Sequence, residues 1–135
     1  MIDHISLVVA DLSRSADFYD AVLAPLGLGL LVRETGRLGY GKAYPEFWLN
    51  QRRSPPTVPE DSGQHVCLRA PDRAAVLAFH RIALAKGGRC DGPPGERQAS
   101  ITVYFGAFVR DSDGNRIEAV TFPKPDSPQP PSTGA

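Results

Sequence analysis

The sequence predicts an α+β fold made of two related βαβββ modules. The first observation is an internal repeat, because residues 3–9 (DHISLVV) reappear at an offset of 61 residues as 64–70 (QHVCLRA). Identical residues continue at the same offset beyond this stretch: Asp11 and Asp72, Phe18 and Phe79, Leu23 and Leu84, and Gly27 and Gly88. Recurrence of similar residues at one fixed offset indicates repeated supersecondary units.

The first module, residues 1–50, opens with an apolar, β-branched stretch over 2–9 that predicts a buried strand. Asp11 or Ser13 supplies a capping oxygen for a helix, and Pro25 and Gly27 end that helix. The helix carries one apolar stripe, formed by Phe18, Tyr19, Val22, Leu23 and Leu26. Three further strands are expected over 28–33, 38–42 and 46–51.

Residues 51–63, which contain three prolines, are expected to be a linker to the second module, residues 64–122. This module starts with a strand over 65–70 and a helix that begins at Pro71-Asp72 and ends at Gly87-Gly88. A short strand over 89–91, a loop over 92–100 and long strands over 101–110 and 116–122 complete it. The run 111–115 (DSDGN) is typical of a turn between two strands.

Residues 1–122 therefore make one domain of ordinary size for a chain of 135 residues. Residues 123–135 contain five prolines and no large apolar side chain. Such a segment cannot offset its ordering entropy by burial, so a disordered tail is predicted.

Composition excludes several function classes. Fifteen basic residues balance fifteen acidic ones, so no basic excess indicates a nucleic-acid or membrane partner. No apolar run approaches the roughly 18–20 residues of a membrane span, and no signal-peptide pattern opens the chain. A cytoplasmic protein is expected, with Cys67 and Cys90 reduced because their spacing fits no redox or metal motif.

His4 and His65 are the residues that best indicate chemistry, because they occupy matching positions of the two repeats. If the modules pair about a pseudo-twofold axis, both imidazoles can face one cavity. Glu118 is the only acid of the last strand, where an unpaired buried carboxylate would be costly. Two histidines and one carboxylate suit a divalent ion such as Fe(II), Mn(II), Ni(II), Co(II) or Zn(II). The competing interpretation is that the histidines are structural and that Glu118 faces water on an edge strand.

The paired modules, His4, His65 and the run 111–118 (DSDGNRIE) resemble the vicinal oxygen chelate superfamily of glyoxalases, bleomycin resistance proteins and extradiol dioxygenases. The resemblance covers residues 1–122, and its most specific part is Asp-Gly-Asn-x-x-Glu. It implies a cup-shaped half-barrel of mixed sheet with the helices outside, and His4, His65 and Glu118 as metal ligands. It also implies a homodimer, with the cup closed within one chain or across two.

One position departs from the glyoxalase I pattern. Those enzymes carry a fourth ligand, a Glu, on the last strand of the first module. Matching Phe47 to Ile117 places Trp48 at that position, while Glu46 lies two residues away on the same face. A three-ligand site is therefore expected, with Glu46 as the alternative fourth ligand.

Other residues are expected around the cavity. Tyr104 is a candidate catalytic residue that donates to a substrate oxygen, acting with Glu118, or it packs without such a role. Trp48 and Phe108 are expected to line the cavity and bind substrate, or to pack in the core. Arg97, with Arg52 and Arg53, is a candidate for binding an anionic substrate, against the alternative of surface charge. The third histidine, His80, is expected to be structural.

The leading hypothesis is a divalent-metal-dependent enzyme that binds a small substrate through vicinal oxygens. Lyase or isomerase chemistry is favoured over dioxygenase chemistry, because no histidine is placed as a second acid–base group. The alternative is a metal-free, bleomycin-resistance-like protein that binds a small molecule without turnover.

Overall fold

The computed structural model describes residues 1–99 and 101–123, and each module has the predicted βαβββ order. The elements of the first are β1 (Ile5–Val9), α1 (Leu12–Leu23), the 3-10 helix η1 (Ala24–Leu26), β2 (Gly29–Glu34), β3 (Arg37–Gly41) and β4 (Phe47–Gln51). Those of the second are β5 (Val66–Arg69), α2 (Arg73–Ala85), β6 (Arg89–Gln98), β7 (Val103–Arg110) and β8 (Arg116–Thr121). The predicted α+β fold is confirmed.

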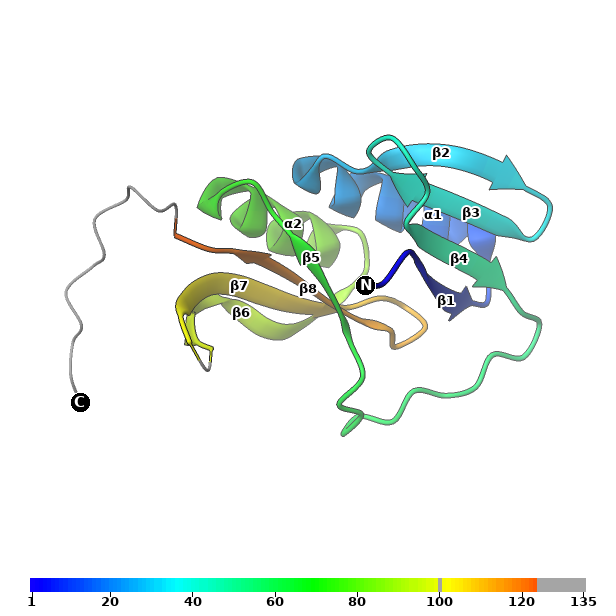
Figure 1. The fold of residues 1–135 in the computed structure, drawn as a ribbon. Helices are drawn as coiled ribbons and strands as arrows, with labels where there is room; N and C mark the ends of the chain where they lie inside the picture. The colour runs from blue at the N-terminus through cyan, green and yellow to red at the C-terminus, as the bar shows by residue number, and fades with distance from the viewer. Residues whose placement is uncertain (100, 124–135) are drawn as a thin grey trace.

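The strands form two mixed four-stranded sheets with equivalent topologies (Figure 1). Their orders are β1-β4-β3-β2 and β5-β8-β7-β6, and in each the first strand runs parallel to the last strand of its module. Within residues 1–99 and 101–123, β1 pairs only with β4 and β5 only with β8. Each module therefore leaves its first strand as an open edge, and neither sheet closes into a barrel.

Both helices begin where the sequence predicts, because each has an aspartate as its N-cap. The Asp11 carboxylate accepts a hydrogen bond from the Arg14 amide at 3.2 Å, and the Asp72 carboxylate accepts one from the Ala75 amide at 2.8 Å. Gly27 ends η1 with a φ of 79°, a left-handed conformation that glycine adopts at no steric cost. None of the helices described is long and apolar enough to cross a membrane.

The core lies between the helices and the sheet faces that they cover (Figure 1). Helix α1 packs against α2, so the modules meet through their helices rather than through paired strands. The turn before β8 adds polar contacts between modules, because Asn115 Nδ2 donates to the Val8 carbonyl at 3.0 Å. The Tyr19 hydroxyl of α1 donates to the buried Asp111 carboxylate at 2.7 Å.

The predicted loop over 92–100 is wrong for most of its length, because β6 is a ten-residue strand that continues to Gln98. Its pairing with β7 shifts register around Gly92 and Gly95. Pro93 and Pro94 fall in this irregular part of an edge strand, which is where a sheet tolerates residues without an N–H donor. Apart from Pro123, the predicted disordered tail lies outside the described residues.

Candidate functional site

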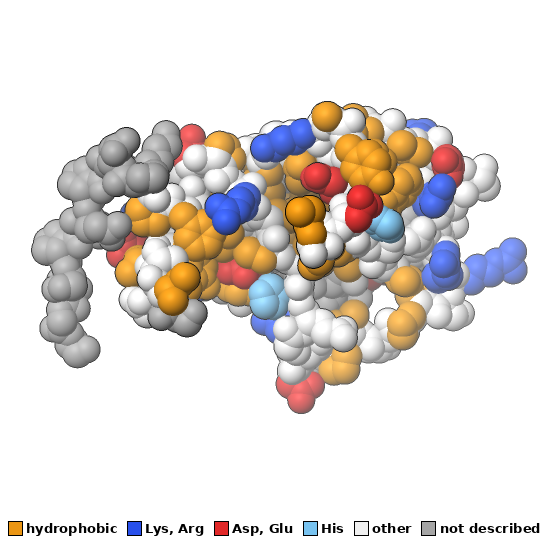
Figure 2. Space-filling model, in the orientation of Figure 1, with side chains coloured by type: hydrophobic (Ala, Val, Ile, Leu, Met, Phe, Trp, Pro, Cys, Tyr) orange, Lys and Arg blue, Asp and Glu red, His pale blue; other side chains and the backbone are white. Residues whose placement is uncertain are grey.

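The sheet of the second module has one face against α2 and one face turned away from it, which we call the open face. Val66 and Leu68 of β5 pack on the core, so alternation turns the neighbouring side chains of this strand to the open face. These are His65, Cys67 and Arg69. The open-face residues of β8 and β7 include Glu118, Val120, Tyr104, Gly106 and Phe108. Figure 2 shows hydrophobic side chains beside acidic and basic ones over these strands.

His65 and Glu118 are brought together by the parallel pairing of β5 with β8. The distance from His65 Nε2 to Glu118 Oε1 is 3.1 Å, although 53 residues separate the two in sequence. The other ring nitrogen, Nδ1, lies 3.2 Å from the Gly63 carbonyl. With its proton on Nε2, the neutral ring donates to Glu118. With its proton on Nδ1, it donates to the Gly63 carbonyl instead and leaves Nε2 free to bind a metal, the arrangement usual for a metal-binding histidine.

Glu118 is a buried carboxylate that its protein neighbours satisfy only in part. The residue is 4% exposed, and its Oε2 atom is buried without a hydrogen-bond partner among the described residues. A buried carboxylate oxygen without a partner costs free energy, and a cation beside it removes that cost. The His65 nitrogen and the unpartnered carboxylate oxygen fit half of a divalent-ion site.

The Glu118 carboxylate affects the pKa of two further side chains, Cys67 and Tyr104. Burial raises the pKa of the Cys67 thiol to about 12, with a further contribution from the Glu118 charge. Burial also raises the pKa of Tyr104, again with help from Glu118. Both groups therefore stay protonated at neutral pH, so the Tyr104 phenol is available as a hydrogen-bond donor.

Phe108 and Arg97 stack on the histidine side of the open face. Phe108 pairs directly with Glu118 across β7 and β8, and its ring lies edge-on to His65 with 5.3 Å between centroids. The Arg97 guanidinium lies 5.3 Å from the centroid of the Phe108 ring. Its donors contact the carbonyls of Gly95, Gly106 and Pro93, so much of its hydrogen-bonding capacity holds the bulged pairing of β6 with β7.

His4 lies apart from this pair, immediately before β1 in the other module. Its side chain is 53% exposed, and Nδ1 lies 2.6 Å from the carboxylate of its neighbour Asp3. Within residues 1–99 and 101–123, no three His, Cys, Asp or Glu side chains are grouped as a metal site. One chain thus brings together His65 and Glu118 and leaves His4 elsewhere.

Trp48 and Glu118 occupy equivalent positions of the two modules. Trp48 pairs with Ser6 across β4 and β1, as Glu118 pairs with Cys67 across β8 and β5. Because Ser6 and Cys67 are themselves 61 residues apart, the register matches Trp48 to Glu118. Glu46 is exposed and lies just before β4.

The Trp48 ring lies over Gly39 of β3, where a Cβ atom would come within 2.9 Å of it. The Arg37 guanidinium stacks on the same ring at 4.6 Å from its centroid. Arg52 and Arg53, the other predicted anion-binding residues, are exposed on the linker, and Arg52 bonds the Gln51 carbonyl. Trp48 thus packs on the first sheet, against Gly39 and Arg37. Within the part of the chain described, neither Arg52 nor Arg53 forms a hydrogen bond or ion pair with His65 or Glu118.

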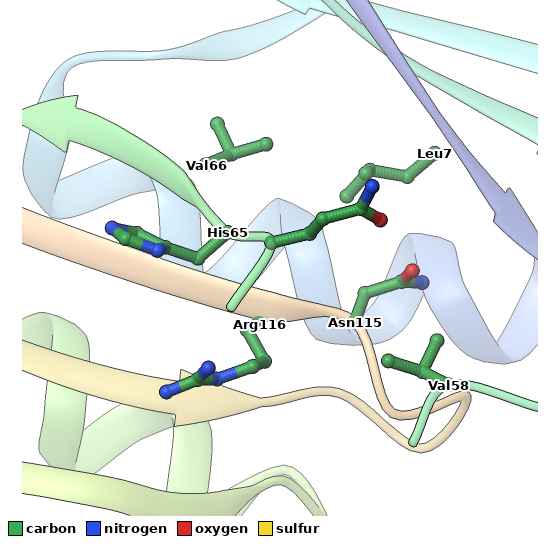
Figure 3. A pocket seen from close by; sticks show the side chains of 7 residues that line it. Leu7, Val58, His65, Val66, Asn115 and Arg116 are labelled. Atoms are coloured by element: carbon green, nitrogen blue, oxygen red, sulfur yellow. The ribbon is translucent and has the colours of Figure 1, made fainter. Parts of the chain in front are cut away.

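A cavity of about 150 Å³ lies at the seam between the two modules (Figure 3). Leu7 of β1 lines one side, and His65 and Val66 line the other. The remaining lining residues come from the linker and from the turn before β8: Val58, Gln64, Asn115 and Arg116. The seam is therefore hollow where the open edges of β1 and β5 approach each other.

Sequence reasoning missed two residues of the open face. Cys67 and Arg69 follow His65 at i+2 and i+4 on one strand, so period-two alternation places all three on one side of the sheet. That spacing was the signal that could have found them.

A family profile described as the Glyoxalase/Bleomycin resistance protein/Dioxygenase superfamily matches residues 1–119. A glyoxalase/bleomycin resistance protein from Albidiferax ferrireducens T118 is similar in structure, with 33% identity and a TM-score of 0.78, over 87% of this chain and 96% of that one. The fosfomycin resistance protein FosX from Mesorhizobium loti shares the fold, with 17% identity and a TM-score of 0.66, over 91% of this chain and 92% of that one. The comparison with curated proteins found no match. The chain belongs to the glyoxalase/bleomycin resistance protein/dioxygenase superfamily.

Proposed function

We propose that this protein is a divalent-metal-dependent enzyme whose site contains His65 and Glu118. The observation that carries the proposal is the buried Glu118 carboxylate. Its Oε1 atom lies 3.1 Å from His65 Nε2, and its Oε2 atom has no hydrogen-bond partner among the described residues. Neutral imidazole and carboxylate suit Zn(II), Ni(II), Mn(II), Co(II) or Fe(II). When bound, such an ion would stabilise negative charge on a substrate that presents two adjacent oxygens.

The third ligand in this proposal is His4 of a second copy of the chain. His4 is exposed and directly precedes β1, an open edge of its sheet, while His65 directly precedes β5, the open edge of the other sheet. Pairing β1 of one copy with β5 of another would cover both edges, which are otherwise prone to unwanted association. By twofold symmetry a homodimer would contain two such sites.

Tyr104 and Phe108 would act on the substrate within the same site. The Tyr104 phenol remains protonated at neutral pH, so it donates a hydrogen bond to a substrate oxygen as negative charge develops there. Phe108 holds the His65 ring from its edge and limits the access of water. These roles suit lyase or isomerase chemistry, in which an anion forms next to the bound oxygens.

The proposal is tested by the metal content of protein purified without chelator and then incubated with each of the five ions. Wild type is expected to hold close to one ion per chain, whereas His65→Ala and Glu118→Ala are expected to lose it. Glu96→Ala is the matched control, because Glu96 is an exposed carboxylate that pairs with Arg73. Wild type that stays free of metal with every ion would contradict the proposal and favour a metal-free binding protein.

A further inference from the structure

The end of the linker, residues 60–63, is held against the second sheet by two arginines. Arg110 Nη2 donates to the Glu60 carbonyl at 2.7 Å, and Arg116 Nη1 donates to the Ser62 carbonyl. Both bonds are made to the linker backbone, so they fix the path of the chain and not only the place of a side chain. The linker therefore enters β5 from a fixed position.

Asp91 of β6 joins the two arginines. Its Oδ1 atom lies 3.2 Å from Arg110 Nε, and its Oδ2 atom lies 2.6 Å from Arg116 Nε. The side chains of Arg110 and Arg116 are 4% and 20% exposed. The carboxylate thus orients each guanidinium at Nε while the terminal nitrogens hold the linker. We call Asp91, Arg110 and Arg116 the linker clamp.

His65 follows the clamped segment closely, and its ring lies between two acceptors. Nδ1 lies 3.2 Å from the Gly63 carbonyl, and Nε2 lies 3.1 Å from Glu118 Oε1. His65 and Arg116 line the same cavity at the seam of the modules (Figure 3). A neutral imidazole carries one ring proton, so the two acceptors compete for it. Only the tautomer protonated at Nδ1 leaves Nε2 available to a metal ion.

The repeat shows that the two modules supply the Nδ1 acceptor differently. In the first module it is the carboxylate of Asp3, which lies 2.6 Å from His4 Nδ1. At the offset of 61 residues, the residue before His65 is Gln64, which carries no carboxylate. The acceptor there is the backbone carbonyl of Gly63. Its place depends on the path of the linker, and hence on the linker clamp.

Building on the proposed function, we infer that Arg116 is a positioning residue for the His65 ligand. By holding the Ser62 carbonyl, Arg116 keeps the next carbonyl, that of Gly63, beside His65 Nδ1 and favours the tautomer that can bind a metal. Glu118 is the stronger acceptor because it is charged, and without the linker carbonyl it would keep the proton on Nε2. A group that orients a metal-binding histidine typically contributes about tenfold or more to metal affinity.

The first test locates the His65 proton in protein without metal. Long-range proton–nitrogen NMR at a pH where the ring is neutral distinguishes the two tautomers, and His65→Gln identifies the signals. Glu118→Ala is the background, because it removes the competing acceptor and a proposed metal ligand together. In this background His65 is expected to be protonated mainly at Nδ1. Adding Arg116→Ala should lower that fraction about twofold or more, because the Gly63 carbonyl is no longer held in place.

Two further changes in the same background make this test specific. Arg89→Ala is the matched control, because Arg89 is an exposed arginine that contacts the linker only through the Glu60 side chain, at 3.0 Å. It should leave the tautomer ratio unchanged. Ser62→Gly loosens the linker and spares the sheet, so it should shift the ratio in the direction of Arg116→Ala even if that variant folds poorly.

The second test measures metal affinity with Glu118 in place, where Arg116→Ala should weaken binding about tenfold and Arg89→Ala should bind as wild type does. A tautomer ratio that neither Arg116→Ala nor Ser62→Gly changes would overturn the inference, even if metal binds at His65 and Glu118. A ratio that depends on Arg116, in a protein whose wild type never binds metal, would support the positioning role while the proposed function fails.

Discussion

Trp48 and Glu118 occupy the same position in the two modules, each paired with the residue two places after the repeated histidine. The first module places its indole over Gly39, whereas the second places a buried carboxylate beside His65. The two modules thus share the strand register at this position and differ in the side chain. We take this difference as the reason to expect a three-ligand site.

Gly39→Ala tests how tightly Trp48 is held. The new Cβ atom would lie 2.9 Å from two indole atoms and 3.1 Å from the Pro45 Cβ, so the ring must move. We expect a loss of about 1–3 kcal/mol in the free energy of unfolding, as for other overpacked sites. Gly29→Ala is the control, because nothing lies within 4 Å of its added Cβ. Urea unfolding that ranks the two variants equally would contradict this packing.

Tyr19→Phe tests the buried contact between the modules. The change removes the 2.7 Å hydrogen bond to Asp111 and leaves that carboxylate oxygen with the Asn115 amide as its partner. We expect a loss of about 1–2 kcal/mol of stability, measured by thermal or urea unfolding. Tyr44→Phe removes an exposed hydroxyl contact to Asp3 and should change stability by less than about 0.5 kcal/mol. Equal effects of the two changes would show that the buried bond is not important.

Asp91→Asn tests the ion pairs that anchor the linker side of the second module. Asp91 lies 3.2 Å from Arg110 Nε and 2.6 Å from Arg116 Nε, and Arg110 is only 3% exposed. Removing the charge leaves the buried Arg110 guanidinium with only the exposed Glu60 carboxylate, 3.9 Å away, as an acidic neighbour. At pH 7 we expect a loss of about 3 kcal/mol in unfolding free energy.

The ion pairs of Asp91 with Arg110 and Arg116 also predict how stability changes with pH. Burial alone would raise the pKa of Asp91, but the ion pairs with Arg116 and Arg110 outweigh it and lower this pKa below 3.8. A lowered folded pKa gives stability that is complete above the unfolded value and is lost as pH falls through the folded value. The difference between wild type and Asp91→Asn should therefore shrink below about pH 4. Asp61→Asn, an exposed control, should show no such trend.

Local signals account for what the sequence predicted well. The two aspartate caps and the helix ends depend on neighbouring residues, and the repeat is visible in the sequence itself. All of them can therefore be recognised without knowing the fold. The repeat singled out His65, and period-two alternation in the last strand singled out Glu118; the structure places the two 3.1 Å apart.

Non-local pairing accounts for what the sequence did not reveal. Strand β6 continues through Pro93 and Pro94 because its edge position and bulges remove the need for their missing donors. Arg97 was predicted to overhang the cavity, yet carbonyls of its own sheet take up its donors. Asp91 became a partner of Arg110 and Arg116 only through strand register. In the proposed site, the place of His4 depends on assembly, which a single chain's sequence does not specify.

The measurement that tests the central claim most directly is metal binding by a mixture of two inactive variants. His4→Ala and Glu118→Ala are purified separately, unfolded and refolded together in equal amounts, and then assayed for bound metal. If His4 of one copy joins His65 and Glu118 of another, each mixed dimer regains one intact site, and the mixture recovers about one quarter of the wild-type metal content. Each variant refolded alone should recover none. A mixture that binds no more metal than its components, while refolded wild type binds fully, would contradict a site shared between two chains.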